Sequence, residues 1–381
     1  MVDSQHTSFD VAIVGGGVCG LVVAWRARAR GLTVCLLDRG PLGDGATHAA
    51  AGMLAPVTEA DPGERALLTL GLESARRWPA FADELRDVTA IDVGYRATGT
   101  LVVARDRDEL EALDRELALR ERLGLEAHRL MPSQARGLEP ALAPTVRGGL
   151  HVPSDHSADP RALVAALIAA CEGAGAVLRP GCEATRLIAD AGRATGVELR
   201  GGDVVRAASV VVAAGAWSAD LEGVPADARV PVRPVKGQIM RLRDRSGPGL
   251  LDRVLRYEGG YVVPRGDGSY VLGATQEERG FDTRLTALGV YEMLRDAQEL
   301  IPGLLELEIA EAQAGLRPGT PDNAPALGAS GALDGLFWAT GHHRNGILLA
   351  PMTGDLLATE LSGEGAVAEA FSPDRFAEVR A

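Results

Sequence analysis

The chain has 381 residues, of which 46% are hydrophobic and 24% charged, a composition typical of a globular protein large enough for two domains. Its 39 basic and 52 acidic side chains give a formal net charge of −13, which disfavours nucleic acid and anionic membranes as partners. The four cysteines (Cys19, Cys35, Cys171 and Cys182) lack metal-ligand or CxxC spacing, and no basic segment with a cleavage site opens the chain. We therefore expect a cytoplasmic protein with reduced thiols, no membrane span and no metal.

A strand, a glycine turn, a helix and a second strand are predicted between residues 10 and 38. The turn holds Gly15, Gly17 and Gly20 in a G-x-G-x-x-G pattern, and the second strand ends on Asp38. The first glycine permits a tight turn, the second lets backbone approach a pyrophosphate, and the third brings helix against strand. The helix N-terminus attracts phosphate, and the acid accepts both ribose hydroxyls. The unit predicts a dinucleotide site, with NAD and a glycine-rich turn without ligand as alternatives.

Small residues follow Asp38 in the run GATHAAAGMLAP. Such a run leaves room for backbone to pass close to a second, larger body. The N–H groups near Ala46–Thr47 and Ala51–Met53 are placed to bond a pyrophosphate and the edge of a flavin ring. The alternative is a loop whose small residues pack helix against sheet.

The rest of the chain alternates between helical and strand patterns. Helices are expected at Glu64–Val88, Asp106–Leu123, Pro160–Glu172, Arg284–Leu300 and Asn345–Leu361. Strands are expected at Thr100–Ala104, Ala176–Arg179, Glu183–Ala189, Ala194–Leu199, Ser209–Ala213, Val235–Arg243, Val254–Tyr257, Gly260–Pro264, Tyr270–Ala274 and Leu336–Thr340. This order predicts an α/β fold in which a Rossmann-like nucleotide-binding domain (residues 1–58, 145–225 and 325–381) carries an inserted α+β domain (59–144 and 226–324) with a mainly antiparallel sheet.

Two arginines flank the last glycine turn of the chain. Arg317 lies in GLRPGT, and Arg344 lies in GHHRNG, just before the helix expected from Asn345. A helix N-terminus there would stabilise negative charge on the edge of a flavin ring. A guanidinium can bind a carboxylate through two hydrogen bonds, which suits a small amino acid or a hydroxy acid as substrate. The alternative for either arginine is an ion pair at the surface.

Several motifs together make the chain resemble the D-amino-acid oxidase-like family of FAD enzymes, and within it the glycine oxidases. They are VAIVGGGVCGL, ATHAAAGMLAP, VVAAGAWS, PVKGQ, GYVVPR, GLRPGTPDNAP and GHHRNGILLAPMTG, and they extend from residue 10 to 354. The first motif marks any FAD or NAD protein, whereas ATHAAAGMLAP, GLRPGT and GHxRNGILLAP are narrow.

The resemblance implies positions for cofactor and substrate. FAD would contact Gly15, Gly17, Val18, Cys19, Gly20, Asp38, Arg39, Ala46, Thr47, Ala51, Gly52, Met53, Thr185, His342, His343, Arg344, Asn345, Gly346, Ile347 and Leu348. Arg317 would bind the substrate carboxylate, with Tyr261 and Arg344 completing the pocket. Tyr261 is equally consistent with a strand residue buried in a core. The stretch Ala314–Leu316 offers no cysteine to tether a flavin, so non-covalent FAD is expected.

The activity that the resemblance implies is oxidation of a small amino acid or amine. Hydride would pass from the α-carbon to flavin N5, and dioxygen would take the electrons and give hydrogen peroxide, with no acid or base residue required. Glycine oxidation would supply an imine for the thiazole of thiamine. Gln276, where a glycine oxidase pocket is expected to be apolar, leaves D-alanine, sarcosine and a different acceptor open. A flavin-binding subunit without turnover is the other alternative, and a homo-oligomer is permitted.

Overall fold

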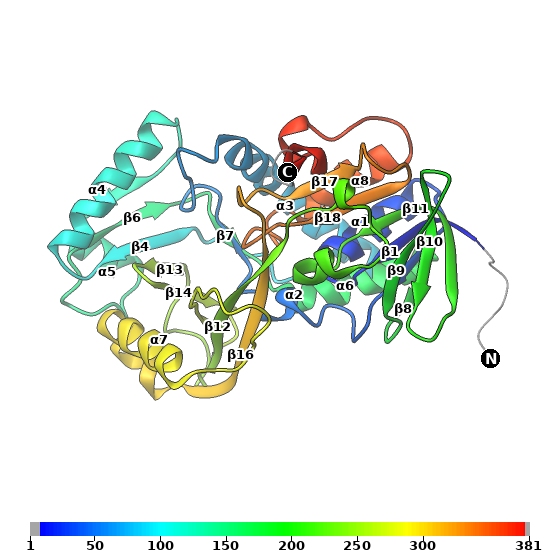
Figure 1. The fold of residues 1–381 in the computed structure, drawn as a ribbon. Helices are drawn as coiled ribbons and strands as arrows, with labels where there is room; N and C mark the ends of the chain where they lie inside the picture. The colour runs from blue at the N-terminus through cyan, green and yellow to red at the C-terminus, as the bar shows by residue number, and fades with distance from the viewer. Residues whose placement is uncertain (1–7, 378–381) are drawn as a thin grey trace.

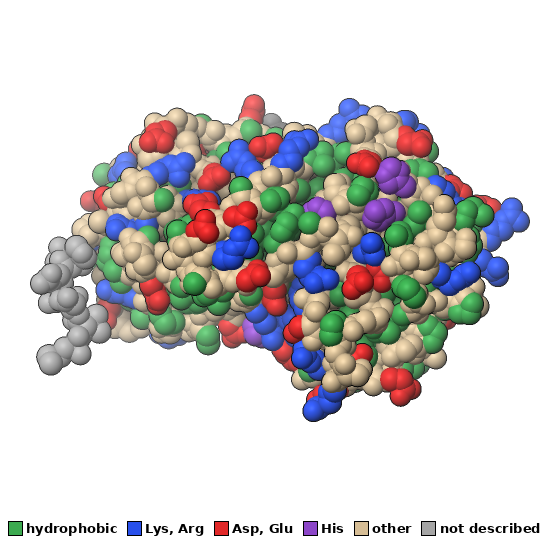
Figure 2. Space-filling view, turned by 180° about the vertical axis from the view of Figure 1, so that it is seen from behind, with side chains coloured by type: hydrophobic (Ala, Val, Ile, Leu, Met, Phe, Trp, Pro, Cys, Tyr) green, Lys and Arg blue, Asp and Glu red, His purple; other side chains and the backbone are tan. Residues whose placement is uncertain are grey.

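The computed structural model describes residues 8–377, and these form two large sheets that lie side by side with helices packed on them (Figure 1). The long strands β12 (Arg233–Arg243) and β16 (Glu308–Gly319) run between the two halves of the molecule. On the face drawn in Figure 2, basic and acidic side chains are interspersed over both halves. No helix within residues 8–377 combines the length and apolarity needed to cross a bilayer.

The first sheet has the strand order β17-β18-β11-β1-β2-β8, and its neighbours from β18 to β8 run parallel. An antiparallel hairpin, β9 and β10, continues from β11. The strands are β1 (Phe9–Val14), β2 (Val34–Leu37), β8 (Val177–Arg179), β9 (Ala184–Asp190), β10 (Arg193–Leu199), β11 (Val204–Val212), β17 (Ala326–Ala329) and β18 (Leu336–Thr340). The helices α1 (Val18–Ala29), α3 (Arg65–Thr89), α6 (Pro160–Gly173) and α8 (Ala350–Leu361) contribute to the core of this half. Two short elements, α2 (Ala46–Ala49) and β3 (Met53–Leu54), follow the glycine unit, and β3 pairs with β7 (His156–Ser157), which comes much later in the chain.

The second sheet has the order β16-β12-β15-β14-β13-β4-β6-β5, and only the β13–β4 pair is parallel. Its remaining strands are β4 (Thr100–Ala104), β5 (His128–Leu130), β6 (Gly148–Val152), β13 (Val254–Tyr257), β14 (Gly260–Pro264) and β15 (Ser269–Gly273). Three helices belong to this half: α4 (Arg107–Arg122), α5 (Pro132–Leu138) and α7 (Ala287–Leu300). The expected mainly antiparallel sheet is confirmed.

The helix predictions succeed where capping residues are clear. Asp106 and Asp159 cap α4 and α6, and each side chain accepts a backbone N–H of its helix. The expected start of the last helix at Asn345 is wrong, because residues 346–349 form turns and α8 begins at Ala350. Pro351 lies in the first turn of α8, and a proline at that position is the sequence signal that marks the true start of the helix.

Strand β16 carries Arg317 and was not predicted. Its segment contains Gly315, Pro318 and Gly319, which favour a turn when read alone. It forms a strand because it pairs with β12 from Glu308 to Gly319, and it tolerates Pro318 because it lies at the edge of the sheet.

Two of the predicted domain boundaries need correction. Strand β6, assigned to the nucleotide domain, pairs with β4 and β5 in the second sheet. Helix α3, assigned to the inserted domain, buries Trp78 and Phe81 in the same core as Ile13 of β1. Pattern alone cannot show which sheet a strand joins, so the remaining boundaries stay predictions.

Candidate functional site

The glycine turn after β1 is as tight as its sequence predicts. Gly15 has φ +113°, and a Cβ there would lie 2.3 Å from the carbonyl oxygen of Ala213. A Cβ on Gly20 would lie 1.9 Å from the carbonyl oxygen of Gly15. Around Gly17, by contrast, a Cβ would meet only the Thr47 hydroxyl, at 3.4 Å. The turn therefore holds α1 close to β1 while leaving backbone accessible at Gly17.

The N-terminus of α1 opens into a large cavity. Gly17, Val18 and Cys19 line it, and the Val18 N–H donates to the Thr47 hydroxyl at 3.2 Å. Thr47 therefore supports the first turn of α1 from another segment, a role that the sequence did not reveal. The positive end of the helix dipole attracts an anion such as a pyrophosphate.

Asp38 lies where β2 ends, next to the glycine turn. Its two carboxylate oxygens accept the N–H groups of Gly16 at 2.7 Å and Gly40 at 2.8 Å. The Arg39 guanidinium lies 3.9 Å above the ring of Trp217, in the 3-10 helix Gly215–Asp220. Both Asp38 and Arg39 line the cavity, and so does Thr185 at the start of β9, as expected for residues near an adenosine.

The small-residue segment after β2 is held from outside by arginines. Arg265 donates to the carbonyls of Ala51 at 2.8 Å and Ala158 at 3.1 Å, and Arg241 donates to that of His48 at 3.0 Å. Burial lowers the pKa of Arg265 to about 10. Since the C=O and N–H of a trans peptide point in opposite directions, the Gly52 N–H points away from Arg265.

All five predicted residues of this segment (Ala46, Thr47, Ala51, Gly52 and Met53) line the cavity. Arg241, on β12, and Arg265, just after the end of β14, are far from this segment in sequence, and no local signal marks them.

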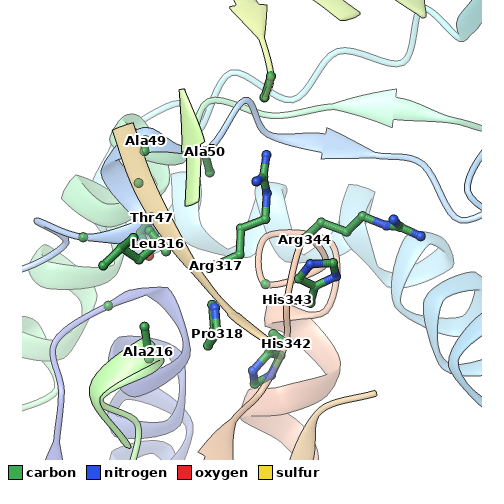
Figure 3. Close-up of a pocket in the computed structure, with 18 of the residues that line it drawn as sticks. Thr47, Ala49, Ala50, Ala216, Leu316, Arg317, Pro318, His342, His343 and Arg344 are labelled. Atoms are coloured by element: carbon green, nitrogen blue, oxygen red, sulfur yellow. The ribbon is translucent and has the colours of Figure 1, made fainter. Parts of the chain in front are cut away.

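The cavity has a volume of about 1120 Å³ and is lined by residues of both halves (Figure 3). That volume exceeds the roughly 300–1,000 Å³ of pockets that hold drug-sized ligands. A Cβ added to Gly45 or Gly215, which also line it, would have nothing within 4 Å. Part of the cavity wall is therefore backbone without side chains, which leaves room for a long nucleotide.

Arg317 projects from β16 into this cavity (Figure 3). Its Nη1 donates to the carbonyl oxygens of Thr275 at 3.2 Å and Lys236 at 3.3 Å. A Cβ on Gly237, in the neighbouring strand β12, would lie 2.3 Å from the same nitrogen. Within residues 8–377 no carboxylate lies at ion-pair distance from Arg317. The guanidinium is thus positioned by carbonyls and keeps its charge available.

Tyr261 on β14 also lines the cavity and lies close to Arg317. Burial raises the pKa of its hydroxyl, and the charge of Arg317 and a side-chain hydrogen bond to it lower that pKa in part. A Cβ on Gly273 would lie 2.6 Å from the Tyr261 hydroxyl, so the neighbouring strand leaves room for the ring. The structure brings these two predicted substrate residues together.

Arg344 is engaged differently. Its Nε lies 2.8 Å from Oε2 of Glu59, whose Oε1 lies 2.7 Å from Nη1 of Arg256. In Figure 3 the Arg344 guanidinium points away from Arg317. Burial raises the pKa of Glu59, but the charges of Arg256 and Arg344 outweigh it and the pKa is lowered. Glu59 and Arg256 line the cavity, and sequence reasoning missed both of them.

Two adjacent histidines form another part of the wall. The His342 ring contacts the Thr353 hydroxyl at 2.9 Å through Nε2 and the Cys19 thiol at 3.5 Å through Nδ1. Burial lowers the pKa of His342 and of His343 to about 4, so both are neutral near pH 7. Burial raises the pKa of Cys19 to about 12, which keeps its thiol protonated.

The remaining predicted cofactor residues near the C-terminus do not all line the cavity. Asn345, Gly346 and Ile347 line the cavity, whereas Leu348 is buried in the core. The Leu348 carbonyl accepts hydrogen bonds from Ser74 and Trp78 of α3. Like Leu348, Gly20 is not among the residues lining the cavity, and its place is the contact between α1 and the glycine turn.

These observations fit FAD. The positive end of α1 and the bare backbone at Gly17 suit a pyrophosphate, and Asp38 suits a ribose. The cavity continues from there to Arg317, far enough to place a ring system beside a carboxylate-binding group. Each part of the cavity thus has the chemistry that the corresponding part of FAD requires.

Comparison with known proteins gives the same assignment. A family model described as "FAD dependent oxidoreductase" matches residues 10–360. The glycine oxidase of Geobacillus kaustophilus (strain HTA426) is 36% identical over 351 residues, which cover 92% of each chain. The crystal structure of that species' glycine oxidase superposes with a TM-score of 0.90, at 35% identity, covering 97% of this chain and 99% of that one.

Two further relatives extend the range of activities. A bifunctional protein ThiO/ThiG of Trichormus variabilis is 38% identical over 352 residues, and the match covers 92% of this chain but 52% of that protein, about half its length. The iminodiacetate oxidase (IdaA) of Chelativorans sp. BNC1 has a TM-score of 0.86 at 31% identity, covering 95% of this chain and 98% of that one.

Proposed function

The chain belongs to the family of FAD-dependent oxidoreductases, and from that premise we propose that it oxidises glycine, with dioxygen as the electron acceptor. FAD is its cofactor, and it is an amino-acid oxidase of the glycine-oxidase type that acts on CH–NH2 groups. Three parts of the proposal go beyond this assignment. They are the choice of glycine among small amines, the release of hydrogen peroxide and a role in thiamine thiazole biosynthesis.

The observation that carries the proposal is the state of Arg317. It is held by two backbone carbonyls, lies beside Tyr261 and keeps its charge free for a ligand. A guanidinium in a partly desolvated cavity binds a carboxylate through two charge-assisted hydrogen bonds. A carboxylate fixed there places the α-carbon of a small amino acid inside the cavity, in a defined orientation.

The residues around the site need to do little chemistry. Bound FAD supplies the acceptor for the two electrons that leave the α-carbon with its hydrogen. Arg317 and Tyr261 orient the substrate, and this alignment is the main contribution of the protein. His342 and His343 are neutral near pH 7, and neither is assigned as a base. The amine therefore has to enter in its neutral form.

The electron balance sets the products. Glycine loses two electrons and two protons to become its imine, and one dioxygen takes them up as hydrogen peroxide. The relative that joins ThiO and ThiG in one polypeptide supports a link to thiamine thiazole biosynthesis, in which the imine would be consumed. The iminodiacetate oxidase relative supports a substrate other than glycine as the second candidate.

The test starts from purified holoenzyme. Under anaerobic conditions, glycine, sarcosine and D-alanine are added separately, and the flavin absorbance is followed. Bleaching by glycine at the lowest concentration, followed by peroxide release when air is admitted, supports the proposal. Bleaching by D-alanine or sarcosine alone rejects glycine as the substrate. Failure of all three to reduce a bound flavin favours a non-catalytic subunit, and reduction without reoxidation by air rejects dioxygen as the acceptor.

A further inference from the structure

Three of the arginines that line the cavity, Arg256, Arg317 and Arg344, lie close to Tyr261 or Glu59, and they differ in how their charges are balanced. Arg317 has no carboxylate partner among residues 8–377, as described above. Arg256 and Arg344 share a single carboxylate, that of Glu59. The three guanidinium groups therefore offer one free position for an anion, and the other two are already occupied from within the protein.

Glu59 bridges its two arginines with one oxygen each. The distances are 2.7 Å from Oε1 to Arg256 and 2.8 Å from Oε2 to Arg344. The Glu59 side chain is 13% exposed, whereas those of Arg256 and Arg344 are 24% and 39% exposed. Both arginines line the cavity, and both are more exposed than the carboxylate that neutralises them.

The backbone of the two residues before Glu59 is fixed by contacts that do not involve the Glu59 side chain. The N–H groups of Val57 and Thr58 donate to the buried Asp155 at 3.0 and 2.6 Å. The carbonyls of the same two residues accept hydrogen bonds from the buried Arg120 at 3.1 and 2.8 Å. Because both sides of this segment are held in this way, neutralising Glu59 should leave the loop in place.

We propose that Glu59 is a specificity-determining residue that restricts the cavity to substrates with a single carboxylate. Its side chain acts as a built-in second carboxylate for Arg256 and Arg344, and a dicarboxylic amine therefore meets a neutralised pair and a repelling anion. This inference rests on the proposed function, because it assumes that the substrate carboxylate binds Arg317. A purely structural ion pair would stabilise the loop without affecting ligand choice.

The test measures ligand binding to oxidised holoenzyme and needs no turnover. Acetate and malonate are titrated at constant ionic strength, and binding is followed by the change in flavin absorbance. In Glu59→Gln we expect the dissociation constant of malonate to fall at least tenfold, while that of acetate stays within about twofold. An unchanged or weaker affinity for malonate, including no detectable binding, overturns the proposal.

Three further variants separate charge from structure. Glu59→Asp keeps the charge and should bind malonate as the wild type does. Glu59→Gln combined with Arg344→Gln should reduce the gain, because only one of the two freed cations remains. Glu73→Gln is the matched control, since Glu73 also pairs with two arginines, Arg76 and Arg77, on the surface of α3. A gain in Glu73→Gln, or an undiminished gain in the double variant, contradicts the role of Glu59.

Turnover separates this inference from the proposed function. Iminodiacetate is glycine that carries a second carboxymethyl group on its nitrogen. If glycine reduces the flavin, the ratio of kcat/KM for iminodiacetate to that for glycine should rise at least tenfold in Glu59→Gln. If glycine does not reduce the wild-type flavin, the proposed function fails, and the acetate and malonate titrations still decide whether Glu59 controls the second carboxylate.

Discussion

The two ends of the cavity are built by different means. At the dinucleotide end, glycine turns and small residues present backbone to the ligand, and the key groups lie within residues 15–53. At the substrate end, charged side chains from segments far apart in sequence converge, among them Glu59, Arg256 and Arg317. The first end depends mainly on how closely the backbone can approach the ligand, whereas the second depends on which charge is paired with which.

The largest effect is expected at the substrate end. Arg317→Ala removes a charge-assisted pair of hydrogen bonds to the substrate carboxylate, worth about 3 to 4 kcal/mol. We expect kcat/KM for glycine to fall by roughly 100- to 1,000-fold, while the affinity for FAD changes little. Steady-state kinetics and an FAD titration measure the two effects. Arg317→Lys should recover part of the activity, and equal loss of FAD affinity in Arg317→Ala would show that the two ends are not separate.

His342 contacts Cys19, which lies within the glycine pattern, and Thr353 of α8. Because its pKa is lowered by burial, its contribution to stability depends on pH. Its folded pKa, about 4, lies below its unfolded value, so the stability that it contributes is complete above pH 6.5. That stability is lost as the pH falls from about 6.5 to about 4, because unfolding then lets the ring take up a proton. The loss amounts to at most about 3 kcal/mol, since each pH unit corresponds to about 1.4 kcal/mol.

The corresponding experiment is urea unfolding of the apoprotein across this pH range. His342→Asn removes the titrating group. The slope of the unfolding free energy against pH should therefore decrease by an amount equivalent to at most one bound proton. A slope that stays identical in wild type and variant would mean that His342 is protonated equally in both states.

The sequence predicts the two ends unequally, and the reason is physical. Asp38 and the glycines of the turn are recognisable because their roles depend on backbone close by. Arg317 and Arg344 were both named from the sequence, but their states differ because of Glu59, which adjoins Arg344 only in the fold. The strand that carries Arg317 was missed because its pairing with β12 overrides the turn signals of its glycines and proline.

At the dinucleotide end, Gly20→Ala tests local geometry. A Cβ would lie 1.9 Å from the Gly15 carbonyl oxygen, so α1 has to move away from the turn. Such overpacking costs about 1 to 3 kcal/mol, and we expect weaker FAD binding together with lower stability. Denaturant unfolding and FAD content after purification measure these effects. Gly173→Ala in α6, where a Cβ meets nothing within 4 Å, is the matched control and should be neutral or slightly stabilising.

The smallest effect is expected for a side chain at the dinucleotide end. The Arg39 guanidinium lies 3.9 Å above the Trp217 ring, a contact typically worth about 0.5 to 1 kcal/mol at an exposed site. If backbone dominates at this end, Arg39→Ala should weaken FAD binding only about two- to fivefold and leave kcat/KM for glycine unchanged in FAD-saturated enzyme. Isothermal titration of the apoprotein with FAD gives the affinity. If Arg39→Ala instead weakens FAD binding as strongly as Arg317→Ala lowers glycine turnover, side chains govern both ends. A single exposed cation would then outweigh the backbone contacts of the glycine turn.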